Sequence, residues 1–155
     1  MRLVILREDY KMRIAIGNDH RGIDYKKAVL EMLERAGHEY KDFGTNTPDA
    51  VDYPDIAKEV GKEVVTGGVD YGILICGTGI GMCISANKIK GIRAAMCRNT
   101  FDATRARQHN NANILCLGAE YGLDGVEDII NTFLTTDFEG GRHIPRIEKI
   151  RAMEE

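Results

Sequence analysis

The sequence has none of the features that would place the protein in a membrane, on a nucleic acid or in a secretory pathway. No apolar run approaches the roughly 20 residues that a membrane-spanning helix needs. At the N-terminus the apolar residues 3–6 are followed at once by Arg-Glu-Asp, which is not the layout of a signal peptide. The net charge of −3 offers no electrostatic attraction for DNA, RNA or an anionic membrane. We therefore expect no nucleic-acid partner and no membrane partner.

The cysteines also form no pattern that would bind zinc or build a disulfide framework. The four of them include no CxxC pair, and no histidines lie nearby at ligand spacing. They are Cys76, Cys83, Cys97 and Cys116. We expect no metal site and reduced thiols, and reduced thiols in a mid-sized acidic chain predict a cytoplasmic location.

What the chain does have is a regular alternation of short β-rich runs and helical periods. Its 155 residues, of which 43% are hydrophobic, are enough for one domain with a real core. Strands are expected at 13–17, 38–44, 71–76, 92–97 and 114–118. Helices are expected at 23–37, 52–68, 84–89, 100–110 and 126–134. This alternation predicts an α/β fold, in which a five-stranded parallel sheet is covered by helices on both faces.

Both ends of the chain lie outside this pattern. Residues 1–11 are interpreted as an extension of unknown role, because MRIAIG from Met12 would make a natural start. The domain proper is expected at 12–137, and 138–155 is expected to form a C-terminal arm. In that arm Ile144, Ile147 and Ile150 recur every three residues, which predicts an apolar face that packs on another surface. That surface is expected to belong to a second copy of the protein.

Polar and glycine-rich clusters follow several of the expected strands. They occupy 18–22, 76–81, 109–111 and 118–120. In open parallel sheets, ligands bind beyond the carboxyl ends of the strands. We therefore expect these clusters to form one site.

The cluster CGTGIG at 76–81 places a cysteine directly before alternating glycines. Gly77, Gly79 and Gly81 allow the backbone to approach a ligand closely, and amide groups before a helix stabilise negative charge. The spacing matches neither the dinucleotide GxGxxG nor a Walker loop, so a tight turn alone is the alternative. A thiolate is favoured at such a position, which makes Cys76 a candidate nucleophile or proton-abstracting base. The other three cysteines are interpreted as small apolar core residues.

Histidine and arginine residues supply possible partners for this thiolate. His109 ends an expected helix, where the partial negative charge favours an imidazolium that can act as an acid. Considered alone, it would be interpreted as a surface histidine. Asp19 and His20 follow the first strand and are candidate contacts for hydroxyl or phosphate groups, although Asp19 is also a possible helix cap. Arg142 and Arg146 lie four residues apart and would suit one phosphate, or else form a solvated charge pair.

Five segments together resemble the ribose-5-phosphate isomerase B family, which includes galactose-6-phosphate isomerase subunits. They are NDHRG (18–22), CGTGIGMCISANK (76–88), GIRAAMC (91–97), QHNNAN (108–113) and GGRHIPRI (140–147). The resemblance covers about residues 12–152 and keeps the family's order. It implies a Rossmann-like, cofactor-free aldose–ketose isomerase that works as a homodimer, or dimer of dimers, with shared active sites.

The resemblance also assigns roles to particular residues. It implies that Cys76 is the base that moves a proton between C2 and C1 of the sugar. It also implies that His109 is the acid that helps to open the sugar ring. The implied substrate contacts are Asp19, His20, Gly77, Thr78, Gly79, Ile80, Gly81, Asn110, Arg142 and Arg146. One position departs from the family pattern, because many members carry an arginine shortly after strand five where this chain has Glu120.

Three functions are therefore expected in order of preference. The first is interconversion of ribose 5-phosphate and ribulose 5-phosphate through an enediolate. The second is isomerisation of a hexose 6-phosphate, such as allose or galactose 6-phosphate. The third is a phosphosugar-binding module without catalysis, which the presence of both Cys76 and His109 argues against because binding needs neither.

Overall fold

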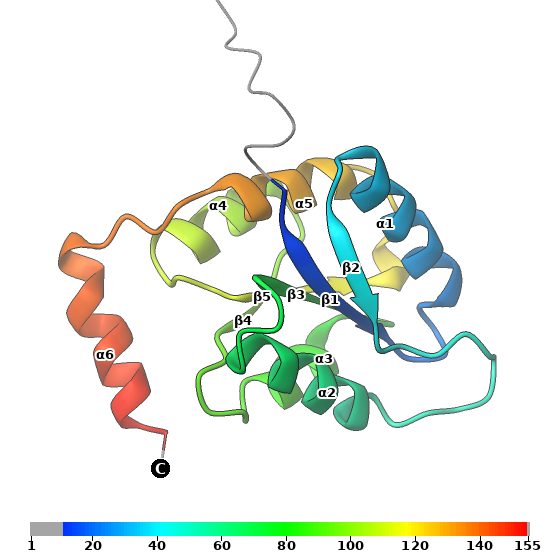
Figure 1. The fold of residues 1–155 in the computed structure, drawn as a ribbon, viewed down its shortest axis with the longest axis horizontal. Coiled ribbons are helices and arrows are strands. Elements are labelled where there is room, and N and C mark those ends of the chain that lie inside the picture. Colours follow the sequence, from blue (N-terminus) through cyan, green and yellow to red (C-terminus); the bar gives the residue numbers. More distant parts are fainter. Residues whose placement is uncertain (1–10, 155) are drawn as a thin grey trace, which may run out of the picture.

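The computed structural model describes residues 11–154, so all but Lys11 of the expected N-terminal extension lies outside the described residues (Figure 1). The strands are β1 (Arg13–Asn18), β2 (Glu39–Asp42), β3 (Tyr71–Cys76), β4 (Ala94–Met96) and β5 (Ile114–Gly118). The helices are α1 (Ile23–Arg35), α2 (Tyr53–Val65), α3 (Ile80–Ala86), α4 (Thr100–Gln108), α5 (Val126–Thr135) and α6 (Ile144–Ala152). Short 3-10 turns at Ala119–Tyr121 and Gly141–His143 complete this part of the chain.

The five strands form one parallel sheet in the order β2-β1-β3-β5-β4, which confirms the predicted fold class. The register is set by hydrophobic alternation, since successive side chains point to opposite faces of a strand. In β3, Ile73 and Ile75 face one core, while Leu74 and Cys76 face the other. Buried on both sides, the central strands are apolar throughout, as a parallel sheet requires.

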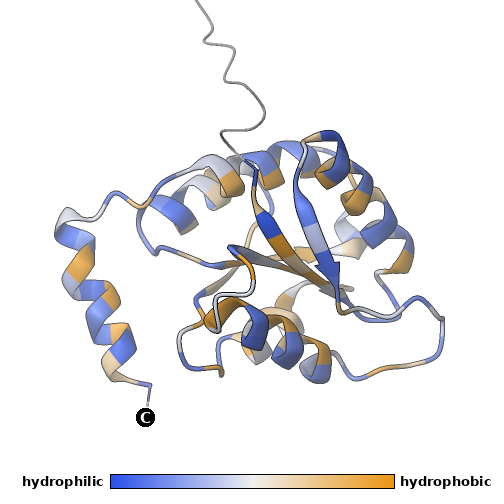
Figure 2. Ribbon diagram, in the orientation of Figure 1, coloured by the Kyte–Doolittle hydropathy of each residue, from blue (hydrophilic) through white to orange (hydrophobic). Residues whose placement is uncertain are grey.

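The helices cover the sheet in two layers, as Figures 1 and 2 show. α1, α4 and α5 pack on one face through residues such as Val29, Ala106 and Phe133. α2 and α3 pack on the other face through Val60 and Met82. Apolar side chains fill both cores. Within residues 11–154 no helix is long and apolar enough to cross a membrane.

The helix after β3 differs most from its expected bounds. The sequence predicted it at 84–89, whereas α3 begins at Ile80 and ends at Ala86. Its start is set by Gly79, which has a φ of 80° in the left-handed region and turns the chain directly from the glycine loop into the helix. The loop and the helix are consequently one continuous structure at the end of β3.

The direction of chain winding reverses beside β1. The connection from β1 leads to β2 on one side, and β3 then returns to the other side of β1. Such a topological switch point leaves a crevice at the carboxyl ends of the two strands, where open α/β sheets bind ligands. Asp19 follows β1 at this place and Cys76 ends β3.

The C-terminal arm runs away from the sheet. In Figure 1, α6 stands apart from the two layers, beyond β4 and α4. The amide of Gly91 donates a hydrogen bond to Glu154 at 3.1 Å, which ties the end of the arm to the loop before β4. Of the three isoleucines predicted to share a face, Ile147 is buried, while Ile144 and Ile150 are 46% and 40% exposed. The arm therefore carries apolar surface that the single chain does not cover.

Candidate active site

A cavity of about 570 Å³ lies at the β1/β3 switch point. It collects seven of the residues that the sequence singled out, from two separate segments of the chain. They are Asp19, His20, Cys76, Gly77, Thr78, Ile80 and Gly81. The remaining lining residues are Arg21, Val51, Asp52, Tyr53 and Ile84.

Cys76 is held at the end of β3 with its sulfur at this cavity. Its side chain is only 4% exposed, and Sγ accepts a hydrogen bond from the amide of Gly79 at 3.2 Å. Gly79 has a left-handed φ of 80°, which turns the chain from this hydrogen bond directly into α3. The sulfur of Cys76 is therefore held in place by a backbone amide at the end of β3, beside the glycine loop.

The loop itself is fixed by close backbone packing. A Cβ built on Gly118 would lie 2.7 Å from the carbonyl carbon of Thr78, and one on Gly81 would lie 2.6 Å from the Tyr53 ring. The amide of Glu120 donates to the carbonyl of Gly77 at 2.9 Å, which fastens the loop to the end of β5. The glycines are therefore needed for contact with neighbouring elements as well as for the turn.

Asp19 and His20 are also oriented by the backbone. Asp19 is buried and its Oδ1 accepts from the amide of Arg21 at 3.0 Å, within the turn before α1. The N-cap residue of α1 is Gly22, so Asp19 is not the helix cap that the sequence left open. His20 Nδ1 accepts from the amide of Val51 at 3.3 Å, which leaves Nε2 to carry the proton of the neutral ring. Both side chains are thus held beside Cys76.

A buried lysine that the sequence analysis missed supports the wall of this cavity. Lys26 is 1% exposed, pairs with Asp42 at 2.9 Å, and donates to the carbonyl of Thr45 and to Asn46 Oδ1. These bonds pin the segment between β2 and α2 that leads to Val51 and Tyr53. A signal was present, because position 26 falls on the same helical face as Ile23 and Leu30 yet carries a charge.

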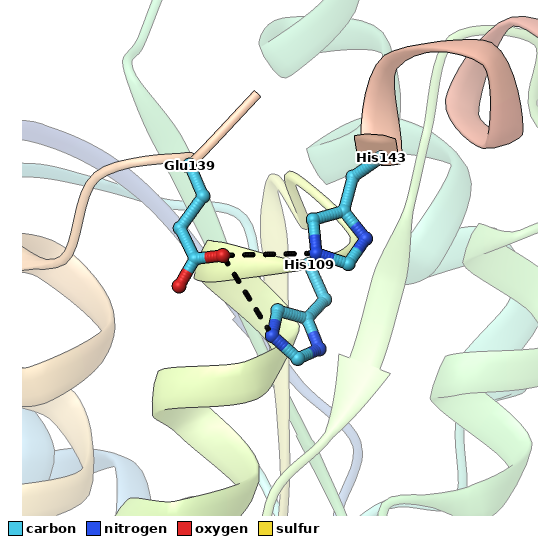
Figure 3. Close-up of side chains that lie close together, drawn as sticks. All are labelled: His109, Glu139 and His143. Carbon is cyan, nitrogen blue, oxygen red and sulfur yellow. Dashed lines mark ion pairs between the residues drawn. The ribbon is translucent and has the colours of Figure 1, made fainter. Parts of the chain in front are cut away.

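A second group of predicted residues gathers around His109 (Figure 3). The rings of His109 and His143 stack with centroids 4.3 Å apart and an interplanar angle of 21°. Glu139 Oε2 lies 3.9 Å from His109 Nε2 and 3.7 Å from His143 Nε2. Burial, followed by the nearby charges of His109, Arg142 and Arg146, lowers the pKa of His143 below its usual 6.5. This cluster holds His109 between a neutral ring and a carboxylate.

The same three side chains are of the types that bind transition metals. His109, Glu139 and His143 place one ligand atom each within 4.8 Å of one another. Imidazole nitrogens coordinate a metal in the plane of the ring. Two nearly parallel rings direct these lone pairs side by side instead of toward a common point, and Arg146 Nη1 contacts His143 Nδ1 at 3.3 Å. The geometry therefore suits positioning of His109 better than coordination.

The other predicted residues lie around this second group. Arg142 is exposed in the 3-10 turn before α6, and Arg146 is in the first turns of α6. Asn110 lines a different cavity, of about 660 Å³, between the arm and the loop before β4. None of these three residues lines the Cys76 cavity in the single chain.

The expectation that all the clusters share one site is wrong for a single chain. α4 connects the carboxyl end of β4 to the amino end of β5, so its C-terminal residue His109 lies at the amino edge of the sheet. Cys76 lies at the carboxyl edge, opposite Gly118 of β5. The five residues of β5 separate the two edges by about 16 Å at 3.3 Å per residue. His109 ends a crossover helix, and such a helix finishes at the amino edge of the sheet, where the next strand begins.

The remaining cysteines differ in their surroundings. Cys97 and Cys116 are buried in the two cores as predicted, and burial raises the pKa of Cys97 to about 12. Cys83 is only half-buried, and a hydrogen bond with Cys116 lowers its pKa to about 7. Cys83 nevertheless packs against the core beneath α2 and α3, in agreement with its interpretation as a core residue.

Comparison with known families and proteins gives a consistent result. The model of the family described as Ribose/Galactose Isomerase matches residues 14–150. Ribose-5-phosphate isomerase B of Escherichia coli is 43% identical over 92% of this chain and 97% of its own. D-erythrulose-4-phosphate isomerase of Pectobacterium atrosepticum is also 43% identical, over 90% of this chain and 93% of its own.

Solved structures agree in fold and in length. Ribose-5-phosphate isomerase B of Clostridium thermocellum superposes with a TM-score of 0.90 at 48% identity, covering 92% of this chain and 97% of that chain. Ribose-5-phosphate isomerase B of Mycoplasma genitalium with bound ribulose-5-phosphate has a TM-score of 0.86 at 45% identity, covering 92% and 95%. The similarity therefore extends over nearly the whole described chain.

Proposed function

Because the chain belongs to the ribose/galactose isomerase family, we propose that it interconverts ribose 5-phosphate and ribulose 5-phosphate through an enediolate. The observation that carries the proposal is the hydrogen bond from the Gly79 amide to Cys76 Sγ, at a cavity on the β1/β3 switch point. The proposed base and its amide donor lie together at this cavity, which supports the proposal. Such preorganisation is the main source of catalytic power in a reaction that develops negative charge.

The proposed reaction begins with opening of the sugar ring. His109 donates a proton to the ring oxygen as the bond from that oxygen to C1 breaks. The C1 hydroxyl gives its proton to solvent water, from which His109 is protonated again, and the open-chain aldehyde results. The Cys76 thiolate then removes the proton from C2, which forms an enediolate with negative charge on O1. Backbone amides of the loop stabilise that charge. Return of the proton from sulfur to C1, with transfer of the O2 proton to O1, gives the ketose.

The side chains alone carry these proton transfers, so the proposal includes no cofactor and no metal. Asp19 and His20 contact substrate hydroxyls, as does Asn110. Arg142 and Arg146 bind the phosphate, because a guanidinium pairs well with a phosphate oxygen. The four free thiols agree with a cytoplasmic location for this enzyme.

A homodimer, or a dimer of dimers, is part of the proposal. Cys76 and His109 lie on opposite edges of one sheet, so a site that contains both must take His109, Asn110, Arg142 and Arg146 from a second copy. Exposed apolar side chains lie near both edges and would be covered by such an association. They are Ile80, Ile84, Phe101, Ile144 and Met153.

The test is an isomerase assay of the purified full chain with ribose 5-phosphate, allose 6-phosphate, galactose 6-phosphate and erythrulose 4-phosphate. The highest kcat/KM is expected for the pentose phosphate. Conversion of none of the four would refute catalysis and leave the phosphosugar-binding module. A higher kcat/KM for a hexose phosphate would favour the second function, which the family description supports, and one for the tetrose phosphate would favour the activity named for the Pectobacterium relative.

A further inference from the structure

The cavity around Cys76 contains a single permanent cation. Of its twelve described lining residues, Arg21 alone is a lysine or arginine, whereas Asp19 and Asp52 are acidic. A sugar phosphate carries about two negative charges near neutral pH. Binding it beside two carboxylates requires a compensating cation from the same wall of the cavity.

Hydrogen bonds hold both the backbone amide and the guanidinium of Arg21 in this wall. Its amide donates to Asp19 Oδ1 at 3.0 Å, and its Nη1 donates to Glu120 Oε1 at 3.0 Å. A Cβ placed on Gly77 would lie 3.3 Å from Arg21 Cδ and 3.1 Å from Glu120 Oε1, so the ion pair lies directly over the glycine loop. The pair joins residues 99 positions apart in the sequence.

Stability does not account for this pair. The Arg21 and Glu120 side chains are 63% and 56% exposed, and ion pairs with this exposure contribute little to folding. Only Nη1 of the guanidinium is bonded within residues 11–154, which leaves several of its N–H donors directed to other acceptors. Glu120 itself is held by its amide on the Gly77 carbonyl, so the carboxylate keeps the guanidinium at the mouth of the cavity.

We propose that Arg21 binds the phosphate group of the substrate, with Glu120 as the residue that holds Arg21 over the glycine loop. This inference rests on the proposed function for its substrate. It also accounts for the one departure from the family pattern: where many members carry an arginine after strand five, this chain places Glu120 there and supplies the guanidinium from the end of β1. The two arginines of the second copy, Arg142 and Arg146, then meet the same phosphate from the opposite side.

Two neutral substitutions distinguish a phosphate contact from a surface ion pair. Arg21→Gln should raise the KM for ribose 5-phosphate and the Ki of inorganic phosphate by roughly ten- to hundredfold, with a smaller effect on kcat. Glu120→Gln should lower both constants, because it removes a negative charge that competes with the phosphate for Arg21. Both variants break the same ion pair, so a purely structural role would change KM in the same direction in both. Changes of KM in opposite directions are expected only if Arg21 binds the phosphate.

The chain offers a matched control at the other end of α1, the helix that follows Arg21. Arg35, at the end of α1, pairs with Glu127 at 3.3 Å with side chains 57% and 48% exposed. Arg35→Gln and Glu127→Gln should leave KM and Ki unchanged, and all four variants should keep the wild-type melting temperature to within a few degrees. An unchanged KM and Ki in Arg21→Gln would overturn the proposal.

A binding measurement separates this proposal from the isomerase itself. In a Cys76→Ala background, calorimetric titration with ribose 5-phosphate should give a Kd that Arg21→Gln also raises by roughly tenfold or more. If the wild type shows no turnover while Arg21→Gln still weakens phosphate binding, the isomerase assignment fails and the role of Arg21 stands. If turnover is present and Arg21→Gln changes neither KM nor Kd, the isomerase assignment stands and the role of Arg21 fails.

Discussion

The two edges of the sheet are built by different means. At the carboxyl edge, backbone groups make the site: glycines, a left-handed turn and amide bonds hold Cys76 in a buried position. At the amino edge, side chains make it: two stacked histidines, a carboxylate and arginines gather on the end of α4 and on the arm. The first edge is complete within one chain, whereas the second faces outward. Under the proposed function, each copy would therefore hold the base Cys76 in its own cavity and supply the acid His109 to another copy.

The largest expected effect comes from removing the thiol at the carboxyl edge. Cys76→Ala should lower kcat by roughly a thousandfold, because it deletes the general base without disturbing the loop around it. Cys83→Ala is the matched control, since Cys83 is a neighbouring thiol that the mechanism does not use. The measurement is initial rate with ribose 5-phosphate, and turnover above a tenth of the wild type in Cys76→Ala would contradict the assignment of the base.

Changes at the amino edge should lower kcat less than loss of Cys76, and they can show whether one site takes residues from two copies. His109→Asn should lower kcat by roughly a hundredfold, as loss of a general acid does. Mixing it with Cys76→Ala under conditions that exchange subunits should restore about a quarter of wild-type activity, because half of the dimers are mixed and each has one intact site. The rates before and after exchange are compared. No recovery, in a preparation shown to contain mixed dimers, would mean that the two residues do not share a site across copies.

The backbone construction of the carboxyl edge predicts a smaller effect for one added methyl group. Gly118→Ala would bring a Cβ to 2.7 Å from the Thr78 backbone, which must shift the loop that holds Cys76. A loss of roughly tenfold in kcat is expected from this misplacement, with a fall in melting temperature of a few degrees. Ala119→Gly, at the next residue, is the control. Wild-type kcat in Gly118→Ala would show that the loop tolerates movement.

The smallest effect is a dependence of stability on pH that comes partly from the amino edge. Burial lowers the pKa of His143 and of His38, so the folded chain binds fewer protons than the unfolded chain at acidic pH. The two neutral histidines therefore favour the folded state above the ordinary histidine pKa of about 6.5, and this contribution to the free energy of unfolding is lost as the pH falls below it. Calorimetry at about pH 7.5 and about pH 5.5 should show a lower melting temperature at the acidic pH, and His143→Gln should reduce the difference. An equal difference in that variant would assign the effect to other groups.

Local patterns were sufficient to predict the strands and the gathering of Asp19, His20 and the glycine loop at one cavity. β3 and β5 have the expected bounds, because buried parallel strands are short apolar runs that end at glycine-rich turns. Asn99 caps α4, and its side chain accepts a hydrogen bond from the amide of Asp102 at 2.8 Å. Cys76 and the glycines lie together because they are adjacent in the chain.

What the sequence did not reveal depends on contacts between distant segments. Nothing local shows that His109 lies at the opposite edge from Cys76, since that follows from strand order and from the direction of the crossover helix. Glu139 and Arg21 were missed because both are charged surface types that contact a distant residue, His109 for Glu139 and Glu120 for Arg21. Lys26 was missed although its position was informative, because a lysine on an apolar helical face is usually read as exposed.

The return of α4 to the far edge of the sheet has a consequence for how this enzyme responds to dilution. Under the proposed shared site, a chain that finds no other copy would hold one half of two different sites and complete neither. Specific activity should therefore fall when the protein is diluted below the dissociation constant of its dimer, and recover on concentration. Assembly would then act as the last step of making the catalyst, and the rate per chain in a cell would rise with the amount of chain synthesised.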